Sequence, residues 1–227
     1  SEESYETFIK RLTDELEKKN LPIPLFIVGQ TGTLTRLTEN VGHFSDENAK
    51  KLANIAKKYS IGLKEHNGDY LDDEILLLHP AIGITAMNVA PEFGAVETQS
   101  YLKLIDVENR LYKQGILKSK SNLEKVLQEE AVKSERWRKW MVGDKVNLAV
   151  EDALKDEKLT RLITEISGHY TFNNDRVKTE IQSMFSSLSY AGIDGEKYVI
   201  NNIKASIDRY VKCFNLEGFT TKILENM

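Results

Sequence analysis

The residues best suited to chemistry follow a short apolar run that begins at Ile61. They are a carboxylate, an imidazole, an amide and a second carboxylate within five positions: Glu65, His66, Asn67 and Asp69. A buried strand that ends in such side chains is how many α/β proteins build a site. The alternative is a strand that runs into an ordinary polar turn.

The imidazole of His66 is the most versatile of these groups, because it can bind a divalent metal ion or transfer a proton near neutral pH. The sequence offers no HxH or HxxE spacing around it, so the metal signal is weak and a structural or hydrogen-bonding role stays open. Glu65 would point to the opposite face of a strand, toward a helix layer and a partner such as Lys64 or Arg36. Asp69 could return to the strand end as a functional group, or it could cap a turn.

The elements that would position these groups alternate between helix and strand. Short apolar runs predict adjacent parallel strands, in chain order, at residues 24–29, 61–66 and 81–87. Apolar stripes at helical spacing predict helices at 5–16, 45–56, 72–78 and 91–113. This order favours helical crossovers between parallel strands.

Residues beyond 116 have a different character. No strand is expected there, and helices are predicted at 121–133, 144–154, 175–188 and 196–214. We therefore expect two regions: a partial β/α barrel over 1–115, and a helical region over 116–227 that packs beside it. Three strands cannot close a barrel of the eight-stranded type, so an α/β fold with an incomplete barrel or a smaller open sheet is predicted.

The composition of the 227-residue chain is that of a globular protein, with 41% hydrophobic and 29% charged residues. A net charge of −4 and the lack of a basic stripe argue against nucleic-acid binding. No apolar run is long enough to span a membrane. The single cysteine, Cys213, excludes an internal disulfide and falls in an apolar helical pattern. These features predict a cytoplasmic protein without membrane association.

The motif KEHNGDYL at residues 64–71, followed by HPAI at 79–82 and a long amphipathic helix, resembles a known family. The family that it resembles is the non-catalytic subunit of class II D-tagatose-1,6-bisphosphate aldolase, formerly described as a tagatose-6-phosphate kinase. The likeness extends more weakly to VGQTG at 28–32, to the two tryptophans and to HYTF at 169–172. The chain carries no Walker loop, so its residues give the kinase description no support.

The resemblance implies a longer TIM-type barrel, with the strands of this chain matching its sixth, seventh and eighth. It implies an accessory subunit of a ketose-bisphosphate aldolase in carbohydrate metabolism. The expected partner is a catalytic aldolase subunit or the missing N-terminal half-barrel. Residues 87–98 are longer and more polar than the Gly-Pro turn expected in the family. This departure keeps open a metal-dependent epimerase or aldolase-type lyase acting on ketose sugars or their phosphates, and an isolated sugar-binding fragment is a third reading.

In such a barrel, the ends of the strands would line one mouth. We expect His66 and Asp69 to be the catalytic residues, and His66 to be a ligand if a divalent ion, Zn or Mn, is bound. Four further residues would bind a ketose sugar or sugar phosphate: Gln30, Asn67, Asn88 and Glu92.

Several polar and aromatic residues outside this cluster have plainer interpretations. His79 is expected to be structural, at the start of the third strand. Trp137 and Trp140 are three positions apart and are expected in a core. Glu97 is expected only to complement the dipole of its helix. His169 could fold back over the mouth.

Overall fold

The computed structural model describes residues 1–226 of the chain. The chain divides into two compact units, Ser1–Ala90 with Asp208–Met227, and Pro91–Ile207. These bounds differ from the two regions expected from the sequence, 1–115 and 116–227, and that division stays a prediction. Of the helices in residues 1–226, none combines the length and apolar composition needed to cross a bilayer.

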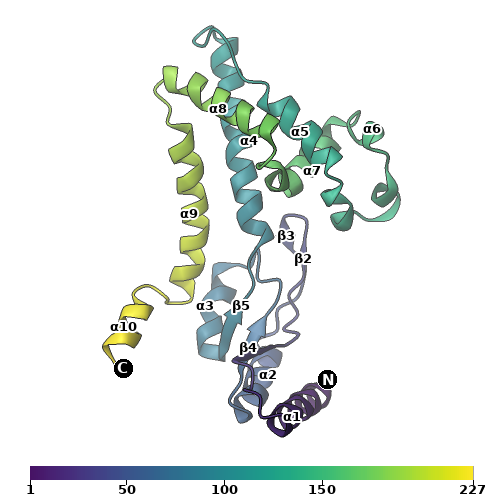
Figure 1. Cartoon of the computed structure of the whole chain (residues 1–227), viewed down its shortest axis with the longest axis vertical. Helices are drawn as coiled ribbons and strands as arrows, with labels where there is room; N and C mark the ends of the chain where they lie inside the picture. Colours follow the sequence, from purple (N-terminus) through teal and green to yellow (C-terminus); the bar gives the residue numbers. More distant parts are fainter. Residues whose placement is uncertain (227) are drawn as a thin grey trace. The chain divides into compact units, whose positions relative to one another are not determined.

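The first unit is an α/β structure (Figure 1). Its elements in chain order are α1 (Glu2–Lys18), β1 (Phe26–Val28), β2 (Thr35–Arg36), β3 (Glu39–Asn40), α2 (Asp46–Lys58), β4 (Gly62–Glu65), α3 (Asp73–Ile82) and β5 (Ile84–Met87). It also contains the last residues of α9 (Gly195–Cys213) and all of α10 (Phe219–Glu225).

Three of these strands form a parallel sheet in the order β1-β4-β5. This confirms the prediction of three adjacent parallel strands in chain order. Leu63 of β4 lies opposite Ile27 of β1 and Ile84 of β5, and a bulge follows Leu63. Because the strands are parallel, their carboxyl ends meet at one edge of the sheet.

The third strand begins later than the sequence pattern predicts. Ala81 and Ile82 belong to α3, which ends at Gly83 with a left-handed φ of 98°. Pro80 lies inside this helix, where it cannot donate a backbone hydrogen bond. Helices usually end before a proline, and for that reason the helix predicted from the sequence ends at residue 78. The prediction that His79 lies at the start of a strand is therefore wrong, because His79 belongs to α3.

One face of the sheet is covered by helices and the other is not. Leu63 and Ile84 pack against the buried face of α2, whose residues Ala49, Leu52 and Ala53 share their core. On the other face, Phe26 and Val28 of β1 are 44% and 38% exposed. Parallel sheets are normally buried on both faces, so this uncovered face is unusual.

A short antiparallel hairpin, β2–β3, lies between β1 and α2. The sequence pattern gives only a polar loop here. Ser45 then caps α2 by accepting a hydrogen bond from the backbone N–H of Asn48 at 3.2 Å.

The second unit consists of helices. They are α4 (Pro91–Lys113), α5 (Leu123–Lys133), α6 (Val150–Ala153), α7 (Glu157–Ser167), α8 (Asp175–Tyr190) and the first part of α9, with 3₁₀ turns at Arg136–Trp140, Gly143–Asn147 and Gly168–Thr171. Residues 119–226 contain no strand, as predicted. The expected helix at 144–154 is wrong, because a 3₁₀ turn and α6 replace it, and α7 was not expected. The core joins α4, α5, α8 and α9.

Candidate functional site

The loop after β4 has a strained backbone at two positions. Asn67 and Tyr70 have φ angles of 58° and 60°, in the left-handed region that costs energy for residues other than glycine. At Gly68 the φ angle is not positive, but a Cβ atom there would lie 2.1 Å from Sδ of Met87, so a larger residue would require the Met87 side chain to move. The loop therefore packs closely on the Met87 side chain of β5 at this position.

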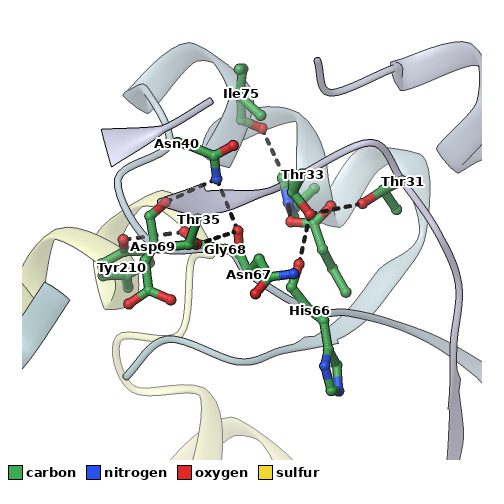
Figure 2. A network of polar contacts seen from close by, with 12 residues as sticks. Thr31, Thr33, Thr35, Asn40, His66, Asn67, Gly68, Asp69, Ile75 and Tyr210 are labelled. Carbon is green, nitrogen blue, oxygen red and sulfur yellow. Dashed lines mark hydrogen bonds and ion pairs between the residues drawn. The ribbon is translucent and has the colours of Figure 1, made fainter. Parts of the chain in front are cut away.

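The hairpin holds the first part of this loop through side-chain donors (Figure 2). Thr33 Oγ1 donates to the carbonyl of His66 at 2.6 Å. Asn40 Nδ2 donates to the carbonyls of Asn67 at 2.9 Å and Asp69 at 3.0 Å. Asn40 Oδ1 accepts from two backbone N–H groups of the hairpin itself, both at 3.2 Å. Asn40 thus joins the hairpin to the loop through both ends of its amide.

The end of α9 holds the rest of the loop. Tyr210 donates its hydroxyl to the carbonyl of Gly68 at 3.3 Å. Arg209 donates to the carbonyl of Leu71 and forms an ion pair with Asp73 at 2.6 Å. The carbonyls of residues 66–69 and of 71 therefore each accept a hydrogen bond from a side chain outside the loop. Such hydrogen bonds fix the backbone from which the exposed side chains of the loop project.

Four of the predicted site residues come together at the carboxyl edge of the sheet with exposed side chains: Gln30, His66, Asn67 and Asn88. Backbone hydrogen bonds link the strand ends, from Gly68 N–H to the Asn88 carbonyl and from Asn88 N–H to the Glu65 carbonyl, each 3.1 Å. Gln30 is fixed through its carbonyl, which accepts from Asn48 Nδ2 at 2.8 Å. The groups offered to a ligand at this edge are amides and an imidazole.

His66 and Asp69 differ in exposure. The imidazole of His66 is exposed and points away from Asp69 (Figure 2). Asp69 is only 3% exposed, and its Oδ1 accepts from the backbone N–H of Ala90 at 2.9 Å. The carboxylate thus fastens the loop to the chain after β5, which is a tertiary contact and not the local turn cap that the sequence left open. The catalytic roles of both residues stay predictions.

Glu65 points toward the helix layer, as strand alternation predicts, but its partner is His79 of α3. Glu65 Oε1 lies 2.7 Å from His79 Nε2, and the two side chains are 0% and 1% exposed. His79 Nδ1 lies 2.7 Å from the carbonyl of Ile75, so Nδ1 carries a proton. The ring of His79 stacks on Phe44 at 5.1 Å. His79 is therefore structural.

From the sequence, Lys64 is expected only as a possible partner of Glu65. In β4 it precedes Glu65 and points to the other face, where its register partners are Val28 and Ala86. Its Nζ lies 5.1 Å from the centroid of the Phe26 ring, on the uncovered face of the sheet. Strand alternation alone was the signal that could have placed it there.

The remaining expected residues lie in the second unit. Glu92, in the first turn of α4, is 7% exposed, and its role in binding stays a prediction. His169 is half-buried beside Tyr170, and burial together with the Lys139 ammonium lowers its pKa. Trp137 is fully buried and donates to the Val132 carbonyl at 2.9 Å, as expected for a core residue.

Within residues 1–226, no three histidine, cysteine, aspartate or glutamate side chains are grouped closely enough to hold a metal ion. Metal binding through His66 stays a prediction.

No model of a protein family matches this chain, and no curated protein does. Among solved structures, the chain is similar to a probable tagatose 6 phosphate kinase from Sinorhizobium meliloti, with 16% identity, a TM-score of 0.60 and coverage of 82% of this chain and 51% of that one. A fructuronate-tagaturonate epimerase from Cohnella laeviribosi, crystallised with glycerol, matches at 13% identity with a TM-score of 0.47, over 95% of this chain and 43% of that one.

The first likeness shows a shared fold, and the second score is too low for that inference. This chain spans about half the length of the Sinorhizobium protein, since it covers 51% of it. Fold and site together define an α/β protein whose small parallel sheet carries a rigid polar loop at its carboxyl edge.

Proposed function

We propose that this protein binds a ketose sugar or sugar phosphate at the carboxyl edge of its sheet, as an accessory, non-catalytic subunit of a ketose-bisphosphate (tagatose-1,6-bisphosphate) aldolase. The observation that carries the proposal is the loop at 66–71. Five of its carbonyls are held by outside donors, while His66 and Asn67 are exposed beside Gln30 and Asn88.

The chemistry of this edge suits a polyhydroxyl ligand. Each amide offers an acceptor oxygen and two N–H donors, and an imidazole offers one of each when neutral. Fixing the backbone that carries such groups before binding reduces the entropy lost when a ligand binds. The Sinorhizobium protein that shares this fold is named for a ketose phosphate, tagatose 6-phosphate.

The arrangement of the carboxylates supports an accessory role. An aldolase needs groups that can take and return a proton at the substrate. Both carboxylates of the β4 end are already engaged, Glu65 with His79 and Asp69 with the N–H of Ala90, and both are buried. Of the titratable residues in the loop at 66–71, His66 alone is exposed. In this proposal, a separate catalytic aldolase subunit carries out the reaction.

We propose further that β1, β4 and β5 correspond to the sixth, seventh and eighth strands of a TIM-type barrel. Two observations support this assignment. The chain covers 51% of a protein with the same fold, and the face of β1 that bears Phe26 and Val28 is uncovered. A barrel would bury this face, and an N-terminal half-barrel would then be the partner that packs on it.

A metal-dependent epimerase or aldolase-type lyase acting on ketoses is the alternative function. The exposed imidazole of His66 favours it, because histidine is a common ligand of zinc and manganese. Such an ion would polarise the carbonyl of a ketose. Residues 1–226 contain no group of three side chains that could hold a metal ion. In this alternative, the other ligands would therefore come from a partner chain.

Calorimetric titration with D-tagatose and D-tagatose 6-phosphate, with and without Zn²⁺ or Mn²⁺, tests the proposal. We expect binding by the wild-type chain and a loss of about tenfold or more in affinity for His66→Ala, as for a lost hydrogen bond. The melting temperature should barely change, because His66 is exposed.

Lys57→Ala is the matched control, since Lys57 is an exposed residue near the end of α2, which leads into the opposite edge of the sheet. Binding that requires the metal, with conversion of the ketose, would support the alternative function. No binding of either ketose by the wild-type chain would exclude the proposed function.

A further inference from the structure

The uncovered face of the sheet carries a cation close to the proposed site. Lys64 precedes His66 by two residues, or about 7 Å of strand. Its side chain leaves β4 between Val28 and Ala86 of the neighbouring strands, and its Nζ lies 5.1 Å from the centre of the Phe26 ring. The ammonium group is therefore held near the carboxyl half of β4, on the face opposite to Glu65.

The carboxylates that could neutralise this cation are turned elsewhere. Glu65 is fully buried on the helix side against His79, and Asp69 is buried against the N–H of Ala90. None of the ion pairs described for residues 1–226 involves Lys64. The exposed groups next to it along the chain, His66 and Asn67, carry no negative charge.

A half-buried lysine without a carboxylate partner is available to a negatively charged ligand. The face of the Phe26 ring attracts the ammonium group and limits its positions. Because the surrounding Phe26 and Val28 side chains are apolar, an anion placed there would interact with Lys64 at a lower effective dielectric than in water.

We propose that Lys64 contacts the anionic group of the ligand, so that the site prefers a ketose bearing a phosphate or a carboxylate over the neutral ketose. This inference rests on the proposed function and adds the residue that determines this preference. His66, Asn67, Gln30 and Asn88 contact the hydroxyl groups, and Lys64 contacts the charged end.

The test compares three ligands by calorimetry: D-tagatose, D-tagatose 6-phosphate and D-tagaturonate. Wild-type protein should bind at least one of the two anionic ketoses more tightly than D-tagatose, and this preference should shrink as salt is raised. Lys64→Gln should lose about tenfold in affinity for that anionic ketose and leave D-tagatose affinity unchanged. The phosphate and carboxylate arms identify which anion the site takes.

Two variants serve as controls. Lys64→Arg keeps the charge and should retain most of the preference. Lys57→Gln removes one charge at the opposite edge of the sheet and should change none of the three affinities. Thermal melts of each variant show whether it remains folded.

Three results would overturn the proposed role of Lys64. An equal loss for the neutral and anionic ketoses in Lys64→Gln would show that Lys64 acts only through the fold or the hydroxyl groups, and would overturn it. Unchanged affinities would overturn it as well while leaving the proposed function intact. Wild-type protein that binds none of the three ligands would overturn both.

Discussion

The imidazole Nε2 of His79 lies 2.7 Å from Oε1 of Glu65, and both side chains are buried. Because Nδ1 of His79 donates to the Ile75 carbonyl, the contact between Nε2 and Oε1 holds one proton. It is either an imidazolium–carboxylate pair or a neutral imidazole accepting from a protonated Glu65. In both forms, the pair joins β4 directly to α3, underneath the loop of the candidate site.

Removal of one partner of this pair should be costly. His79→Ala leaves Glu65 buried without its partner, and it leaves a cavity beside Phe44. We expect a loss of about 3–5 kcal/mol in the free energy of unfolding, as measured by urea denaturation. Glu65→Gln keeps a hydrogen-bonding group at Oε1 and should cost less. A loss below about 1 kcal/mol for His79→Ala would contradict the structural role of the pair.

The rigidity of the site loop depends on Asn40. Asn40→Ala removes two hydrogen bonds to loop carbonyls and two from the hairpin backbone. Backbone amides of residues 66–70 should then exchange with deuterium faster, and ketose affinity should fall with them, because the loop is no longer fixed. Hydrogen-exchange mass spectrometry measures the first effect.

Asn202→Ala is a suitable control for this variant. Asn202 is half-buried in α9 and makes a single described hydrogen bond, to the carbonyl of Tyr198 at 2.8 Å. Exchange at 66–70 that is equally unchanged in both variants would show that the loop is held without Asn40.

The sequence predicts the sheet and the edge of the site well, for a physical reason. Buried parallel strands leave continuous apolar runs, and their carboxyl ends must share an edge, so Gln30, His66, Asn67 and Asn88 could be expected together. The hairpin could not be predicted, because each of its strands has only two residues and shows no apolar alternation.

The partners of the buried acids were also beyond the sequence pattern. That Glu65 faces the helix layer follows from strand alternation. Its pairing with His79 requires α3 to continue through Pro80, and local sequence signals argue against that. The burial of Asp69 depends on how the loop closes onto Ala90, a tertiary contact with no local signature.

The last prediction concerns Glu97 in the second unit. Burial raises the pKa of this carboxyl above its usual 4.5, so the folded state binds the proton more tightly than the unfolded state does. Stability that depends on Glu97 is therefore fully present below pH 4.5 and is lost as the pH rises through the higher pKa of the folded state. Glu97→Gln removes the ionisation and should stabilise the protein at pH 7 relative to wild type, with little effect at pH 4.

Urea denaturation of both proteins from pH 4 to pH 7 measures this difference. Glu15→Gln is the control, because Glu15 is exposed on α1 and its pKa is lowered by the hydrogen bond and charge of Lys18. It should not reproduce the stabilisation at pH 7. If Glu97→Gln and wild type have the same pH dependence, then the Glu97 carboxyl is hydrated in the folded protein, and its burial beside Tyr101 does not govern its ionisation.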